Sequence, residues 1–154
     1  MFRELLFPTP IYVADLNDNA LNQQLERDIV NWSNQDKGIV RTNVNGWHSG
    51  TDMNLRPEYK KLVDLLYEAQ HVIYEQEHLD SEPFLGNMWA NINPPGGLNR
   101  AHIHPNSLWS GVYYVKAGRL IMFPSWLNHC VDTNQSNDIR ISVSFNFMQK
   151  CFMV

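Results

Sequence analysis

From Phe84 onward the hydrophobic pattern changes to a period of two, and this change constrains the fold more than any other feature. Short segments rich in β-branched and aromatic residues alternate there with clusters of Pro, Gly and Asn, which is typical of an antiparallel sheet. The predicted strands cover residues 88–93, 101–104, 109–115, 120–123, 130–133 and 140–148. Many short strands separated by turns favour a sandwich or a barrel.

The segment 140–147 shows this alternation most clearly. Its odd positions are Ile, Val, Phe and Phe, whereas its even positions are Arg140, Ser142, Ser144 and Asn146. A strand of this kind packs its apolar side on a core, so its polar side faces either water or a polar cavity. The alternation alone leaves both options open.

The first eighty residues carry the helical signals. Apolar residues recur every three to four positions over 21–32, with Asp15 or Asn17 as a candidate N-cap, and again over 59–73. We therefore expect two amphipathic helices, and a sheet with one apolar outer face gives them a surface to cover.

We expect residues 1–154 to form a single domain, with helical support at about 15–80 and a β-barrel core at about 84–150. A chain of 154 residues that is 44% apolar and 18% charged can bury such a core. The net charge of −4 argues against nucleic-acid binding, and no apolar run is long enough to cross a membrane. Two cysteines make no disulfide framework and no secretory signal opens the chain, so we expect a cytoplasmic protein.

Three of the six histidines lie in the strand-rich half. His102 and His104 are separated by one residue, so on a strand both imidazoles project from one face, about 7 Å apart. With His129 from another strand they can hold one transition-metal ion. A lone histidine in a strand is more often structural, and the pair by itself is a weak signal. We interpret the remaining three as structural: His48, His71 and His78.

The segments NRAHIHPNSLWSGVYYV (99–115), GRLIMFPSWLNHCV (118–131) and RISVSFNF (140–147) resemble the double-stranded β-helix oxygenases that depend on Fe(II) and 2-oxoglutarate. The segments LFPTPIYV and GWHS are similar to the branch of that superfamily found in bacteria and marine phages. The resemblance covers nearly the whole chain. It implies a mainly β, cupin-like jelly roll with N-terminal helices packed on one face.

The resemblance also implies a metal site in which His102, His104 and His129 hold Fe(II), with 2-oxoglutarate as co-substrate. The family normally uses a His-x-Asp/Glu pair, so His104 stands where a carboxylate is usual. Three neutral imidazoles make the site more positive by one charge, which favours anionic co-ligands. Such a set suits Zn²⁺ as well.

By the same resemblance, Arg140 holds the far carboxylate of 2-oxoglutarate. It lies eleven residues after His129, and a guanidinium pairs bidentately with a carboxylate. Ser142 faces the same way and adds a hydroxyl group. Two further expected cavity-lining donors are Tyr114 (or Tyr113, since only one of the two can face inward) and Asn91.

Only twenty-four residues separate His104 from His129, whereas the family runs several further strands between these positions. Either the barrel is a shortened version or the sequence lacks a segment here, and a shortened barrel exposes strand edges. We therefore expect the barrel to be open near Val115 to Gly118, or to be covered there by a partner chain, as in a homodimer.

The leading hypothesis from these features is an oxygenase that hydroxylates a small-molecule or peptide substrate. Two alternatives stay open. One is a zinc-dependent or cupin-type enzyme that activates water on three histidines. The other is a catalytically degenerate oxygenase fold that serves as a binding module, which the short spacing before His129 favours.

Overall fold

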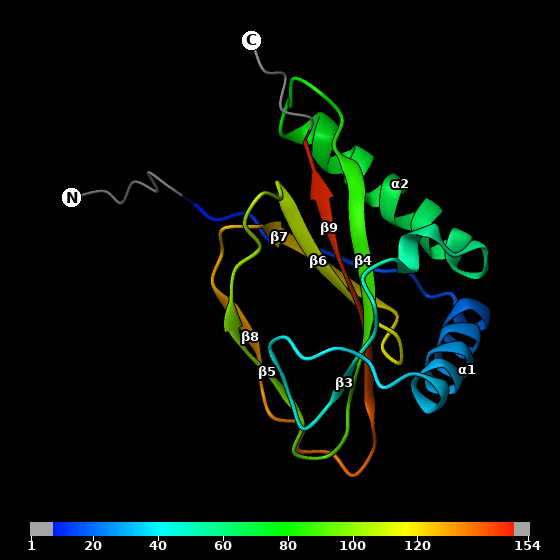
Figure 1. Cartoon of the computed structure of the whole chain (residues 1–154). Helices are drawn as coiled ribbons and strands as arrows, with labels where there is room; N and C mark the ends of the chain where they lie inside the picture. The colour runs from blue at the N-terminus through cyan, green and yellow to red at the C-terminus, as the bar shows by residue number, and fades with distance from the viewer. Residues whose placement is uncertain (1–7, 150–154) are drawn as a thin grey trace.

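The structure is a computed structural model that describes residues 8–149 (Figure 1). Its helices are α1 (Asn19–Gln35) and α2 (Lys60–Gln76), with short 3₁₀ turns at Met53–Leu55 and Pro57–Tyr59. Its strands are β1 (Tyr12–Asp15), β2 (Asn43–Val44), β3 (Trp47–His48), β4 (Phe84–Asn93), β5 (Leu98–His102), β6 (Trp109–Tyr114), β7 (Arg119–Pro124), β8 (His129–Val131) and β9 (Arg140–Met148).

The strands form two antiparallel sheets. The larger has the order β1-β7-β6-β9-β4-β3, and the smaller has the order β2-β5-β8. The two sheets face each other across the interior, and both helices lie on the outer side of the larger one (Figure 1). The predicted jelly-roll fold class is confirmed.

Strand β9 lies at the centre of the larger sheet, between β4 and β6. Its odd residues Ile141, Val143, Phe145 and Phe147 are at most 1% exposed and form the core beneath the helices. Its even residues face the space between the two sheets. The alternation in the sequence therefore reflects one core face and one cavity face, and this excludes the water-facing option.

Helix α1 begins after Asp18, whose carboxylate accepts a hydrogen bond from the Leu21 N–H at 2.9 Å. The predicted N-caps Asp15 and Asn17 are wrong. Asp15 is part of β1 and pairs with Arg119, and Asn17 takes a left-handed conformation with φ 51°. Both residues therefore precede the helix without capping it.

Helix α2 packs on the sheet with a buried apolar stripe. Tyr67 makes an edge-to-face contact with Phe147, with ring centroids 5.4 Å apart, and its hydroxyl accepts a hydrogen bond from the Leu85 N–H. The stripe itself comprises Leu62, Leu66 and Ile73. Within residues 8–149 neither helix is long and apolar enough to cross a membrane.

The β structure is not confined to 84–150 as the sequence predicts. Strand β1 pairs with β7, β2 with β5 and β3 with β4, so the N-terminal half extends both sheets. These added strands have two to four residues, which is too short for a period of two to stand out in the sequence.

The turn between β6 and β7 is closed, so the predicted opening near Val115 to Gly118 is wrong. Tyr114 pairs directly with Arg119, and the Ala117 N–H donates to the Tyr114 carbonyl at 3.1 Å. Gly118 has φ +64°, which a glycine adopts without strain. Helix α1 covers the turn through the Lys116–Glu26 ion pair.

The smaller sheet has three strands against six in the larger, so part of the larger sheet's inner face is covered incompletely. Val112, Tyr114 and Ile121 on that face are half-buried and line a cavity. The inner face of the larger sheet is therefore open at this cavity.

Truncation of the β9 core side chain tests this assignment of faces. Phe145→Ala should lower the free energy of unfolding by about 3–5 kcal/mol, because Phe145 is 0% exposed and its loss leaves a cavity. Val72→Ala, on the exposed side of α2, should change it by less than about 0.5 kcal/mol. Urea denaturation of both variants measures the difference, and similar losses would contradict the assignment.

Candidate metal centre

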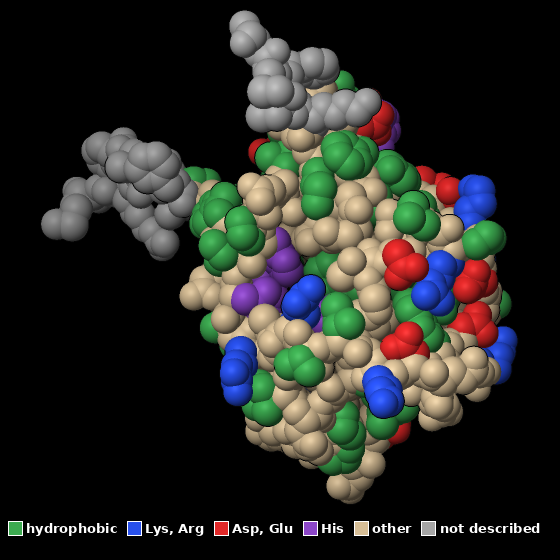
Figure 2. Space-filling model, viewed as in Figure 1, with side chains coloured by type: hydrophobic (Ala, Val, Ile, Leu, Met, Phe, Trp, Pro, Cys, Tyr) green, Lys and Arg blue, Asp and Glu red, His purple; other side chains and the backbone are tan. Residues whose placement is uncertain are grey.

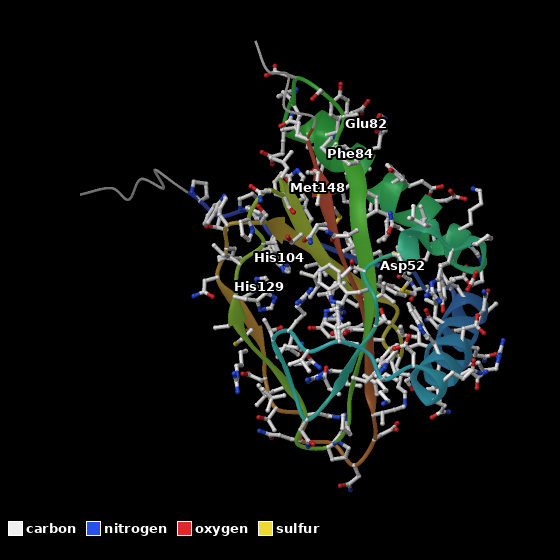
Figure 3. All side chains as sticks on the ribbon, viewed as in Figure 1. Asp52, Glu82, Phe84, His104, His129 and Met148 are labelled. Carbon is white, nitrogen blue, oxygen red and sulfur yellow. The ribbon has the colours of Figure 1, made fainter. Side chains whose placement is uncertain are left out.

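The structure brings His102, His104 and His129 together. Their nearest ring nitrogens lie within 4.8 Å of one another, and the His102 and His129 ring centroids are 4.4 Å apart. Figure 3 shows His104 and His129 side by side between the two sheets. All three side chains are half-buried, and in the space-filling view histidines gather at a hollow in the surface (Figure 2).

Two strand ends and one loop position these rings. His102 ends β5 and lies opposite His129, which begins β8. His104 lies beyond the end of β5, where its N–H donates to the Ser125 carbonyl at 3.0 Å. The expectation that His102 and His104 share one strand is therefore wrong, and the convergence comes from the turn of the chain after His102.

Backbone carbonyls orient the imidazoles. The Nδ1 of His102 lies 2.7 Å from the Arg100 carbonyl, and the Nδ1 of His129 lies 2.9 Å from the Leu127 carbonyl. A carbonyl only accepts, so each Nδ1 carries the proton and each Nε2 presents a lone pair. The Nε2 atoms of His104 and His129 are 3.3 Å apart. Two nitrogens that bind one ion tetrahedrally at ordinary distances are separated by roughly 3.3 Å.

Electrostatics favour the neutral form of these rings. Burial, followed by the nearby charges of His102 and His129, lowers the pKa of His104 to about 4. Burial also lowers the pKa of His129. Metal ions bind neutral imidazole, so His104 and His129 are in their metal-binding form at neutral pH. The cluster contains no carboxylate among the residues that the structure describes.

The histidines form one wall of a cavity of about 410 Å³ between the two sheets. The opposite wall is the inner face of the larger sheet. There Asn91, Ser142 and Tyr114 lie side by side across β4, β9 and β6, and all three line the cavity. Tyr113 points the other way and hydrogen-bonds to Asn22 of α1, so Tyr114 is the inward-facing tyrosine.

Arg140 lies one step along β9 from Ser142 on the same face, but it is not among the residues that line the cavity. Its Nη2 donates to the Asp132 carbonyl at 2.8 Å, whereas its buried Nε has no partner among residues 8–149. Burial raises the pKa of the Tyr114 phenol and the Arg140 charge opposes this rise. The guanidinium is therefore close to the cavity-lining tyrosine.

His48 is a cavity residue that the sequence analysis interprets as structural. It is 4% exposed, lies opposite Asn91 across β3 and β4, and stacks on Trp89 with centroids 5.6 Å apart. Trp89 in turn contacts His104, with centroids 5.7 Å apart. The resemblance of the GWHS segment to the oxygenases is the one signal in the sequence that points to His48. A strand of two residues is too short to show the alternation that would predict which way His48 faces.

The lowered pKa of His104 predicts how the stability of the metal-free protein depends on pH. Above pH 6.5 the ring is neutral in both the folded and the unfolded state. Between pH 6.5 and about 4 the unfolded state takes up the proton first, so stability should fall as pH falls. Urea denaturation with a chelator at pH 7 and pH 5 measures this change.

His104→Gln should reduce the fall between pH 7 and pH 5, because the titrating ring is gone. His78→Asn is the matched control, since His78 is exposed and lies outside the histidine cluster and the cavity. An identical pH dependence in wild type and His104→Gln would contradict the role given to His104.

The strand-rich half of the chain matches a family model described as "Putative 2OG-Fe(II) oxygenase" over residues 87–119 and 115–146. The match is divided at the β6–β7 turn, where the sequence is shorter than the resemblance predicts. No curated protein sequence matches the chain.

Solved structures share the fold at low sequence identity. A prolyl-4-hydroxylase from Pseudomonas putida is 13% identical with a TM-score of 0.70, and the match covers 91% of this chain and 92% of that one. The collagen prolyl hydroxylase of Paramecium bursaria chlorella virus-1, solved with 2-oxoglutarate, is 12% identical with a TM-score of 0.67, covering 90% and 96%. HygX from Streptomyces hygroscopicus, solved with nickel and 2-oxoglutarate, is 8% identical with a TM-score of 0.70, covering 94% and 84%. Over residues 87–146 the chain is therefore similar to the putative 2-oxoglutarate/Fe(II) oxygenase family, and it shares the fold of these solved structures.

Proposed function

We propose that this protein is an oxygenase that uses Fe(II) and 2-oxoglutarate to hydroxylate a small-molecule or peptide substrate. The observation that carries the proposal is the convergence of His102, His104 and His129 on one cavity, opposite the row formed by Asn91, Ser142 and Tyr114. One wall suits a metal ion and the other suits an organic anion.

The three histidines fit a divalent transition metal. They offer neutral nitrogen ligands on rings whose orientation is set by backbone carbonyls, an arrangement typical of metal-binding histidines. Three protein ligands leave further coordination positions free. Because no carboxylate offsets the charge of the ion, the site attracts a dianion more strongly than a site with two histidines and one carboxylate. When bound, the metal and 2-oxoglutarate supply the oxidising chemistry.

The residues around Arg140 fit the distal carboxylate of 2-oxoglutarate. The unpartnered, buried Nε of Arg140 requires an acceptor, since a buried charge without a full set of partners is costly. Ser142 and Tyr114 add hydroxyl donors from adjacent strands, and their Cα atoms are register partners. In this role the protein orients the co-substrate and shields it from water.

Two solved structures of the same fold, each with a bound molecule, support the proposed 2-oxoglutarate site. The viral collagen prolyl hydroxylase and HygX are both solved with 2-oxoglutarate, and HygX also carries nickel.

A zinc-dependent hydrolytic site is the second candidate, and one observation favours it. The cluster consists of histidines alone, a ligand set that also suits Zn²⁺ and the activation of bound water. That chemistry needs neither 2-oxoglutarate nor Arg140, so the two candidates differ in a measurable requirement.

Metal binding is the first requirement to test. The wild-type protein should bind one Fe(II) or Zn(II) per chain, measured anaerobically by competition with a coloured chelator. His102→Ala should weaken metal binding by more than about 100-fold. Loss of a residue that only hydrogen-bonds to a ligand weakens metal affinity by up to about 100-fold, and loss of the ligand itself should cost more. His71→Ala, at an exposed position outside the cavity, should bind as wild type does. Equal affinity in all three proteins would contradict the metal site.

Binding of 2-oxoglutarate to the metal-loaded protein is the second requirement. Anaerobic addition of Fe(II) and 2-oxoglutarate should produce the weak visible metal-to-ligand charge-transfer band. Arg140→Ala should raise the 2-oxoglutarate concentration needed for this band by at least about tenfold, since a charge-assisted hydrogen bond is lost. Arg119→Ala, which removes an exposed arginine paired with Asp15, is the matched control. Metal binding without any band would favour the hydrolytic or a purely structural site.

A further inference from the structure

The end of the cavity away from Arg140 carries a row of neutral polar side chains that the proposed function does not use. Asn87, Asn146 and Ser110 are register partners across β4, β9 and β6, and Phe123 of β7 completes the row. Asn87 and Asn146 line the cavity, although Ser110 and Asn146 are only 1% and 5% exposed. A buried row of amides and a hydroxyl is costly to form unless its hydrogen bonds are satisfied.

The hydrogen bonds within the row run in one direction. The Ser110 hydroxyl donates to Oδ1 of Asn146 at 2.7 Å, and Nδ2 of Asn146 donates to Oδ1 of Asn87 at 2.8 Å. The acceptor of Asn87 is therefore engaged. Its Nδ2 makes no hydrogen bond with any residue that the structure describes, so the row ends in a free amide donor at the cavity wall.

This row lies beside the histidine cluster. Phe123, in the same row, contacts the ring of His129 with centroids 4.6 Å apart. Trp89, two residues from Asn87 along β4 and therefore about 7 Å away, contacts His104. The residues assigned to 2-oxoglutarate lie further along the strands in the opposite direction. A group held by Asn87 thus places neighbouring atoms of the same molecule near the candidate metal.

The cavity also lacks negative charge. Of the residues that line it, Arg41 alone carries a formal charge, and no Asp, Glu or Lys is among them. An ammonium group entering this space finds no counter-ion, and a bound metal adds further repulsion. Burying an unpaired charge is unfavourable, whereas a carbonyl oxygen in this space can accept a hydrogen bond from the free Nδ2 of Asn87.

We propose that the Asn87–Asn146–Ser110 row is a substrate subsite for a neutral carbonyl group of the amide class, which accepts a hydrogen bond from Asn87 Nδ2. The subsite discriminates against substrates that bring an ammonium group to this position, such as free amino acids. Naming the ligand a substrate rests on the proposed function, whereas the binding preference rests on the row alone.

The test is a pair of NMR titrations with ligands that differ in one charge. N-acetylglycinamide is the neutral probe, and glycinamide, with a free ammonium group, is the cationic one. The side-chain amide signals of Asn87 and Asn146 are followed in ¹⁵N-labelled protein at neutral pH. N-acetylglycinamide should shift them saturably, and glycinamide should bind at least about tenfold more weakly. No shift with N-acetylglycinamide, or equal binding of the two probes, would overturn the proposal.

Two variants distinguish binding through the Asn87 amide donor from nonspecific entry of the probes into the cavity. Asn87→Asp replaces the free donor with an anionic acceptor, so the preference should reverse towards glycinamide. Asn137→Asp makes the same charge change at an exposed position and should retain the wild-type preference. Should Asn87→Asp fail to fold, Ser110→Ala removes the donor that orients Asn146 and should weaken N-acetylglycinamide binding several-fold. A wild-type preference in every variant that folds would overturn the proposal.

Each titration is done twice, with metal-free protein and with protein given Zn(II) and 2-oxoglutarate. Discrimination in the metal-free protein together with no metal binding would overturn the proposed function and keep the subsite. Metal and 2-oxoglutarate binding without discrimination between the two probes would keep the proposed function and overturn the subsite.

Discussion

The pairing of β9 with β4 and β6 is the interaction on which the rest of the structure depends. It spans Phe84↔Met148 to Asn93↔Arg140 on one side and continues to β6 on the other. Because side chains alternate across a strand, this one alignment sends the apolar residues of β9 under the helices and its polar residues into the cavity. A slip of one residue would exchange the two faces and remove both the core and the site.

The direct β6–β7 turn is the second constraint. It shortens the chain between His104 and His129, yet the strands on either side still pair and the turn is covered by α1. The three-stranded sheet covers the inner face of the larger sheet incompletely, and the cavity opens beside the histidines (Figure 2). The charge of this cavity follows from its residues, since Arg41 alone among the lining residues carries a formal charge and no Asp or Glu among them balances a metal.

Much of the fold was predictable because its signals are local. Strand 140–148 has the bounds that its alternation predicts, and the apolar stripes of both helices point to the core. The three histidines predicted to converge do so. The N-terminal strands, and the place of Asp15 in one of them, were not predictable, because each depends on a partner distant in the sequence, such as β7 for β1 or Arg119 for Asp15. The closed β6–β7 turn is local, and Gly118 is its signal in the sequence.

The sequence by itself determined which residues alternate, which side chains are able to bind metal, and which superfamily the strand-rich half resembles. The tertiary structure decided what the alternation faces, since only the packing of a second sheet turns a polar strand face into a cavity wall. It also decided that His104 reaches the cluster from a loop, and that His48 and Asn87 belong to the cavity. Residue types and their hydrophobic period can be identified within a short stretch of sequence, whereas the convergence of side chains depends on contacts between segments far apart in the chain.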